Sequence, residues 1–247
     1  MRIILSPAKK MNTDIEAISY ATMPVFLDET KELLVYMQGL SYEEAKKLWA
    51  CNDKIARLNF DRFKDMNLYK GLVPALLSYE GIAYQYMAPA VFEDGQYEYL
   101  QDHLRILSGF YGVLKPMDGV TPYRLEMQAK AKVGDCKNLY AFWGDKLYQE
   151  VIDDSHIIIN LASKEYSKCI EKYLGDQDRF ITCIFGEIAA GKVVQKGVYA
   201  KMARGEMVQF MAEGRIEDPE EMKNFDRLGY RFKEDLSDPL VYTFIRE

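Results

Sequence analysis

Cationic side chains stand beside the glycine- and proline-containing segments of this chain, although its 247 residues carry a net charge of −6. The segment 104–127 shows this best: an apolar run ends at Gly109 and Gly112, and cations and prolines follow. Loops held by a rigid scaffold commonly carry binding groups. We predict a local basic cleft for an anion, since focused potential depends on where charges lie. The cations expected to line it are Lys9, Arg105, Lys115, Arg124, Lys201 and Arg204.

A nucleic-acid backbone is the anion that this set of side chains suits best. Arginine binds phosphate through bidentate hydrogen bonds, and a cleft that contacts several phosphates binds with strongly salt-dependent affinity. We expect Tyr111, Tyr123 and Trp143 to add stacking or edge contacts. The plainer alternative is that Gly109 and Gly112 only permit close packing of a buried connection.

Residues 27–49 have the spacing of a helix-hairpin-helix motif, with helices expected over 27–38 and 41–49. In this motif Gly39, Ser41 and the N-terminus of the second helix face a phosphate, and Lys46 and Lys47 add positive charge. Such contacts position a duplex without reading its bases. However, Ser41 stands where a second glycine is common, and it is expected to form a capping box with the glutamate three residues later. An ordinary helical hairpin therefore remains the alternative.

The same cleft has a second interpretation as an active site. Glu126, Asp145 and Glu165 stand next to cations, and such carboxylates can act as acid–base groups. The substrate would then be a small phosphorylated or nucleobase-like molecule. The chain has no Walker, nucleophile-elbow or dinucleotide-binding pattern, so no catalytic residue is assigned. A third possibility is an interaction protein whose cleft holds no ligand.

Metal and redox chemistry have little support in the sequence. The chain has two histidines, His103 and His156, and lacks the Glu-x-x-His pairs of ferritin-like bundles. We therefore expect no metal site, no cofactor and no direct iron storage. The four cysteines show no Cys-x-x-Cys spacing, so we expect free thiols in a reducing cytoplasm.

The hydrophobic patterning predicts one compact domain over 1–247, a mixed α/β (α+β) fold with a mixed sheet, surrounding helices and a basic cleft. No apolar run is long enough to cross a membrane, and the N-terminus predicts a first strand rather than a signal peptide. Asp94 is expected to cap a helix. Beyond the hairpin, we expect helices over 52–65, 94–107, 140–153, 163–174 and 198–213, and strands over 2–5, 75–79, 156–161, 180–187, 192–195, 229–234 and 240–246.

Several short blocks carry a family resemblance that runs from residue 2 to about residue 246. They are the segment 104–127, Ser6-Pro7-Ala8-Lys9, Leu139-Tyr140 with Phe142-Trp143-Gly144, Asn160-Leu161-Ala162-Ser163 with Glu165-Tyr166, and Ala200-Lys201 with Ala203-Arg204-Gly205. In this order they resemble the peroxide stress protein YaaA family. The resemblance implies a cytoplasmic protein of the peroxide response that lowers free iron and limits oxidative damage. It also implies a positively charged cleft and association with DNA. Our own expectation is that the DNA, duplex or branched, is bound without sequence specificity.

Overall fold

The centre of the molecule is a sheet whose inner strands are almost entirely buried. The structure, a computed structural model, describes residues 1–13 and 18–247. Strand β1 (Arg2–Leu5) lies between β5 (Leu104–Ser108) and β8 (Ile157–Asn160) and is parallel to both. All of β1 except its first residue is buried. A continuous apolar run is typical of a parallel strand that is covered on both faces.

The sheet extends on both sides of this parallel centre in the order β11-β12-β9-β8-β1-β5-β6, and β10 pairs with β9. Strand β9 is parallel to β8 and β12, whereas β6, β10 and β11 are antiparallel to their partners. The predicted mixed α/β fold with a mixed sheet is therefore confirmed. The outer strands are β6 (Gly112–Leu114), β9 (Arg179–Ala189), β10 (Lys192–Val194), β11 (Tyr230–Phe232) and β12 (Val241–Arg246).

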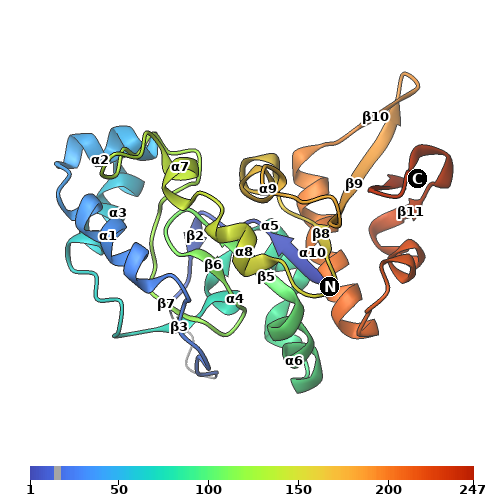
Figure 1. The fold of residues 1–247 in the computed structure, drawn as a ribbon, viewed down its shortest axis with the longest axis horizontal. Helices are drawn as coiled ribbons and strands as arrows, with labels where there is room; N and C mark the ends of the chain where they lie inside the picture. Colours follow the sequence, from blue (N-terminus) through green and yellow to red (C-terminus); the bar gives the residue numbers. More distant parts are fainter. Residues whose placement is uncertain (14–17) are drawn as a thin grey trace.

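Two short antiparallel pairs and a set of helices surround the sheet (Figure 1). The pairs are β2 (Lys10–Met11) with β4 (Tyr79–Glu80), and β3 (Val73–Pro74) with β7 (Gly119–Val120). The helices are α1 (Leu27–Gln38), α2 (Tyr42–Trp49), α3 (Asp53–Lys64), α4 (Ala75–Ser78), α5 (Ile82–Met87), α6 (Asp94–His103), α7 (Leu139–Trp143), α8 (Lys146–Val151), α9 (Lys164–Glu171) and α10 (Gly197–Gly214). Short 3-10 helices lie at η1 (Pro89–Val91), η2 (Pro219–Asn224), η3 (Arg227–Gly229) and η4 (Glu234–Leu236).

The two ends of the molecule differ in character (Figure 1). Helices α1, α2, α3 and α7 form one end, whereas the C-terminal strands and the projecting β9–β10 hairpin form the other. The predicted hairpin of 180–187 with 192–195 is present as β9 and β10. Its turn carries Ala190 and Gly191, both with positive φ.

The largest error in the predicted elements concerns the helix expected over 94–107. Helix α6 ends at His103, and residues 104–108 form strand β5, which is buried along its whole length. A short apolar run fits both a helix face and a buried strand, so periodicity could not separate them. The cap was also misplaced by one residue, because Glu93 rather than Asp94 is the N-cap.

Other predicted elements needed smaller corrections. Residues 75–78 form helix α4 instead of a strand, and strand β4 begins only at Tyr79. The helix predicted over 140–153 is two short helices, α7 and α8, which are separated at Gly144. These segments are short, and tertiary packing overrides local preference most easily in short elements.

Candidate functional site

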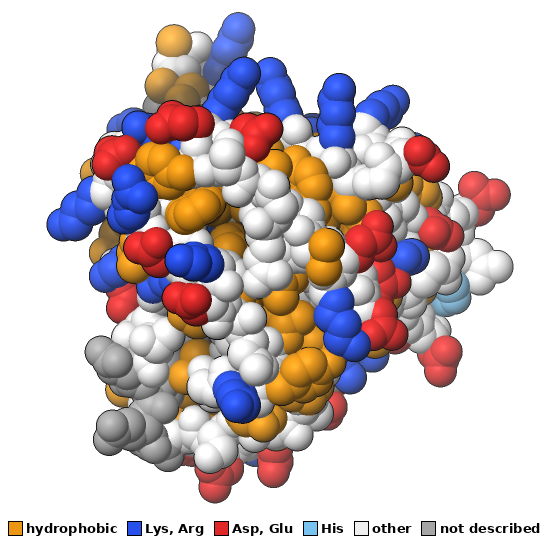
Figure 2. All heavy atoms as spheres, turned by 90° about the vertical axis from the view of Figure 1, so that its left-hand side faces the viewer, with side chains coloured by type: hydrophobic (Ala, Val, Ile, Leu, Met, Phe, Trp, Pro, Cys, Tyr) orange, Lys and Arg blue, Asp and Glu red, His pale blue; other side chains and the backbone are white. Residues whose placement is uncertain are grey.

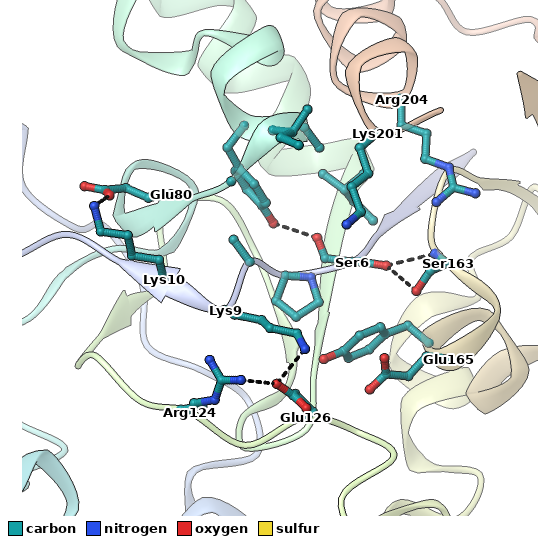
Figure 3. Close-up of a pocket in the computed structure, with 18 of the residues that line it drawn as sticks. Ser6, Lys9, Lys10, Glu80, Arg124, Glu126, Ser163, Glu165, Lys201 and Arg204 are labelled. Carbon is teal, nitrogen blue, oxygen red and sulfur yellow. Dashed lines mark hydrogen bonds and ion pairs between the residues drawn. The ribbon is translucent and has the colours of Figure 1, made fainter. Parts of the chain in front are cut away.

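A pocket of about 380 Å³ opens beside the carboxyl ends of β1 and β8 (Figure 3). Ser6 directly follows β1, and Ser163 stands three residues after β8. Open α/β sheets commonly bind ligands outside the carboxyl ends of their strands. Helices α5, α9 and α10 and the loop 123–126 contribute the other walls. Of the six cations predicted to share a cleft, Lys9, Arg124, Lys201 and Arg204 line this pocket.

Lys201 and Arg204 reach the pocket from helix α10 (Figure 3). Their position depends on the close packing of α10 against α5. A Cβ atom at Gly205 would lie 1.9 Å from the carbonyl oxygen of Ala83 in α5, so glycine permits this approach. Within residues 1–13 and 18–247, no carboxylate forms an ion pair with either cation. Burial lowers the pKa of Arg204.

Lys9 and Arg124 form a network with one carboxylate on the opposite side of the pocket (Figure 3). The Glu126 Oε1 atom is 3.0 Å from the Lys9 ammonium and 2.8 Å from the Arg124 guanidinium. The Trp49 indole N–H of helix α2 donates to the Arg124 carbonyl oxygen at 2.5 Å. The loop also packs against the sheet, because a Cβ atom at Gly109 would lie 2.4 Å from the Leu125 carbonyl oxygen.

Glu165 is another of the three carboxylates that line the pocket, with Glu80 and Glu126, and it follows Ser163 in the first turn of α9. Its Oε1 atom accepts the Gln128 backbone N–H at 3.1 Å. Burial raises the pKa of Glu165, and the nearby charge of Glu126 raises it further. Glu126 and Glu165 thus stand in different environments within one pocket, which is the arrangement that acid–base chemistry uses. Asp145 is instead the N-cap residue of α8 and does not line the pocket.

Ser6 and Ser163 are pocket residues that the site prediction omitted. The Ser163 backbone N–H donates to Ser6 Oγ at 2.8 Å, and Ser6 Oγ donates to Ser163 Oγ at 3.2 Å. The Tyr84 hydroxyl donates to the Ser6 carbonyl oxygen at 3.0 Å. Their positions in the sequence could have predicted them, because both serines closely follow an apolar strand, and ligands commonly bind at the carboxyl ends of such strands.

Arg105 and Lys115 lie outside this pocket. Arg105 belongs to strand β5 and is only 3% exposed, and its guanidinium donates to the carbonyl oxygens of Gln101 and Leu104 at 3.1 and 2.9 Å. Burial lowers its pKa to about 10. Lys115 follows strand β6, where its backbone N–H donates to an Asp118 carboxylate oxygen at 2.8 Å.

The three aromatic residues expected to contact bases are core residues. Tyr111 and Trp143 are each 1% exposed, and Tyr123 is 4% exposed. The Trp143 indole N–H donates to the Gly109 carbonyl oxygen, and the Tyr123 hydroxyl is hydrogen-bonded to Ser108 and Tyr79. The stacking expectation is therefore wrong for Tyr111 and Trp143, which do not line the pocket, whereas Tyr123 lines it as a largely buried residue. For Gly109, the plainer explanation by close packing is correct.

The predicted hairpin has both of its helices, α1 and α2, with the Ser41–Glu44 capping box in place. Its backbone donors are already engaged, however. The Gly39 N–H donates to the carbonyl oxygens of Val35 and Tyr36, and the Ser41 N–H donates to the Glu44 carboxylate at 2.8 Å. A phosphate at this helix N-terminus would have to displace that carboxylate.

The two hairpin lysines differ from each other. Lys46 forms an ion pair with Asp53 at 3.0 Å. Lys47 is exposed and lines a hollow of about 650 Å³ between α2 and the loop 126–130. Glu126 lines both this hollow and the pocket, so the two are adjacent. Figure 2 shows Lys and Arg side chains along the upper edge of this end of the molecule, with acidic side chains among them.

The described part of the chain has neither a metal-binding cluster nor a membrane-spanning helix. Among these residues, no group of three or more His, Cys, Asp or Glu side chains is placed to hold a metal ion. No helix there has the length and apolar character needed to cross a membrane. The cysteines Cys51, Cys136, Cys169 and Cys183 are free thiols, and burial raises the pKa of Cys169 and of Cys183 to about 12.

A family model and several related proteins match this chain over nearly its whole length. The family model described as peroxide stress protein YaaA matches residues 1–236. A UPF0246 protein of Agathobacter rectalis is 63% identical over 247 residues, covering 100% of this chain and 99% of that protein. UPF0246 proteins of Lachnoclostridium phytofermentans and Desulfitobacterium hafniense are 56% and 54% identical, covering 100% of this chain and 96% and 98% of theirs. Because the family model spans nearly the whole sequence, the chain belongs to the peroxide stress protein YaaA family.

Proposed function

We propose that this protein limits oxidative damage in the cytoplasm during peroxide stress by binding DNA without sequence preference. Family membership supports the role in peroxide stress. The observation that carries the DNA-binding part is the pair Lys201 and Arg204, which no carboxylate of the described residues neutralises although the chain is acidic overall. Cations that contact phosphates position a duplex and carry no sequence information.

The proposed contact surface extends from the pocket toward the hairpin. The hollow beside α2 shares Glu126 with the pocket and adds Lys47 and Lys130, which are both exposed. Lys10 stands at the rim of the pocket, paired with Glu80. The acidic partners of Lys9, Lys10 and Arg124 weaken the attraction at those positions, so Lys201 and Arg204 supply most of it.

We also propose that the protein limits free iron together with this binding, and that the binding itself displaces iron from the surface of DNA. DNA carries a condensed layer of counterions, and a protein that contacts its phosphates releases them. Ferrous ions held near DNA would be released together with the other cations, which moves hydroxyl-radical formation away from the bases. This part of the proposal predicts protection of DNA at a fixed concentration of ferrous iron.

The test is an electrophoretic-shift titration with duplex and junction DNA at several salt concentrations. We expect affinity to fall steeply with salt and to fall roughly tenfold in Lys201→Ala. Lys70→Ala is the matched control, because Lys70 is exposed and lies outside both hollows. Absence of binding at physiological salt, or equal affinities of the two variants, would contradict the proposal.

A second candidate function is catalysis on a small phosphorylated or nucleobase-like molecule in the pocket. The observation that favours it is the pair Glu126 and Glu165, which stand in different environments within one small-molecule-sized pocket. A thermal-shift screen of nucleotides and related metabolites tests it. A metabolite that stabilises the fold and is converted to a product supports catalysis, whereas stabilisation without turnover indicates binding alone.

A further inference from the structure

The two ends of the pocket differ in net charge (Figure 3). At one end, Lys9 and Arg124 share the Glu126 carboxylate, and Glu165 adds a second acidic group. At the other end, Lys201 and Arg204 have no ion-pair partner among the residues that the structure describes. The pocket is therefore polarised, and its excess positive charge is located beside helix α10.

The Arg204 side chain is placed to bind a ligand rather than to complete the protein's own contacts. Its Nε atom is buried and has no hydrogen-bond partner among the described residues, and its guanidinium points toward Ser163 (Figure 3). A buried polar atom without a partner costs free energy. An anion between Arg204 and Ser163 would compensate that cost.

Ser6 and Ser163 add neutral donors at the same end. Ser6 Oγ accepts the Ser163 backbone N–H and donates to Ser163 Oγ, so the Ser163 hydroxyl proton is left to donate elsewhere. The Ser163 side chain makes no capping hydrogen bond with α9, although serine at an N-cap commonly does. The first turn of α9 also carries the acidic Glu165, so the Ser163 hydroxyl and not the helix terminus is the donor on this side.

We propose that this end of the pocket binds the phosphomonoester group of a nucleotide. A phosphomonoester carries about 1.5 to 2 negative charges at neutral pH, whereas a phosphodiester inside a strand carries one. The two uncompensated cations match the higher charge. Arg204 and Lys201 hold the phosphate oxygens, with donation from the Ser163 hydroxyl.

The remainder of the pocket suits the nucleoside part. Ile82, Ala83 and Leu161 supply apolar wall in the same pocket. At the far end, Lys9 and Arg124 are donors and Glu126 is an acceptor, and a base edge also presents donors and acceptors together. The same group occurs on a free nucleotide and at the phosphorylated end of a broken DNA strand, and only the second source rests on the proposed DNA binding.

Isothermal titration calorimetry with nucleoside monophosphates, the matching nucleosides and inorganic phosphate tests the proposal. We expect monophosphates to bind at least tenfold more tightly than nucleosides. We also expect Arg204→Gln and Ser163→Ala to weaken monophosphate binding, Arg204→Gln by tenfold or more, whereas Lys70→Ala binds as the wild type does. Circular dichroism and denaturation confirm that each variant is folded. Equal binding of nucleosides and monophosphates, or unchanged binding by folded Arg204→Gln, would overturn the proposal.

Oligonucleotides separate the two sources of the phosphate. Tighter binding of strands with a terminal phosphate than of strands with a terminal hydroxyl identifies a broken strand end as the ligand. If only free monophosphates bind, the phosphate site stands and the free nucleotide is its ligand. Covalently closed circular DNA has no strand ends. If the protein does not bind this DNA but still binds monophosphates, the proposed function is contradicted and the phosphate site stands.

Discussion

The hairpin of α1 and α2 and the pocket beside α10 both combine cations with a helix N-terminus, but they differ in what already occupies their donors. At the hairpin, the Ser41 N–H is bound by Glu44 and Lys46 is paired with Asp53. At the pocket, Lys201 and Arg204 have no ion-pair partner within the described residues, and Arg204 Nε has no hydrogen-bond partner there. We infer from this difference that the pocket, where cationic groups are left unpaired, is the better candidate for a binding site.

Substitution of Gly205 should have the largest effect, because it changes the packing that places both unpaired cations. In Gly205→Ala the new Cβ would overlap the Ala83 carbonyl oxygen of α5, so the free energy of unfolding should fall by about 1–3 kcal/mol. Gly197→Ala in the same helix is the control, since no atom lies within 4 Å of its Cβ position. Urea denaturation measures the free energy of unfolding of both variants. Equal values would show that α5 and α10 can move apart to accommodate the added methyl group.

Replacement of Glu165 should make the stability of the protein less dependent on pH. Burial raises its pKa in the folded state, so its ionisation opposes folding as pH rises through that pKa. Glu165→Gln removes this ionisation and keeps an oxygen that can accept the Gln128 N–H. We expect the variant to be more stable than the wild type near pH 7, with the difference vanishing near pH 4. Denaturation across this range checks the sign, and a difference that grows toward acid pH would refute the assignment.

Removing the carboxylate that occupies the hairpin's donors should leave them free, as the cations beside α10 are. We expect this change to have the smallest effect of the series. Glu44→Ala removes the carboxylate bound to Ser41 and should raise affinity for duplex DNA roughly twofold to threefold. Glu43→Ala is the control, because it removes the same charge from the same turn. Fluorescence anisotropy compares them. Equal gains would mean that charge alone matters and that the freed donors make no contact.

Local sequence signals predicted the local structure well. The apolar run of β1, the Ser41–Glu44 capping box and the turn between β9 and β10 each depend on neighbouring residues. Strand β5 was missed because its apolar residues continue the pattern of the preceding helix, and Arg105 was consequently assigned to a cleft instead of the buried sheet.

The site could be predicted only in part, because it is assembled from distant segments. Ser6 and Ser163 are separated by 157 positions and meet through the parallel pairing of β1 with β8. Charge counting found Lys201 and Arg204, but it could not show which cations have acidic partners. That distinction depends on side-chain positions, as the Lys9–Glu126 ion pair illustrates.

The most direct test of the central claim is the salt dependence of affinity for duplex DNA in the wild type and in the double variant Lys201→Ala, Arg204→Gln. Each phosphate contact contributes about 0.9 to the slope of log affinity against log salt concentration. We predict that the double variant loses about 2 from this slope, whereas Lys70→Ala leaves it unchanged. An unchanged slope in the folded double variant would contradict the claim that these two unpaired cations bind phosphate.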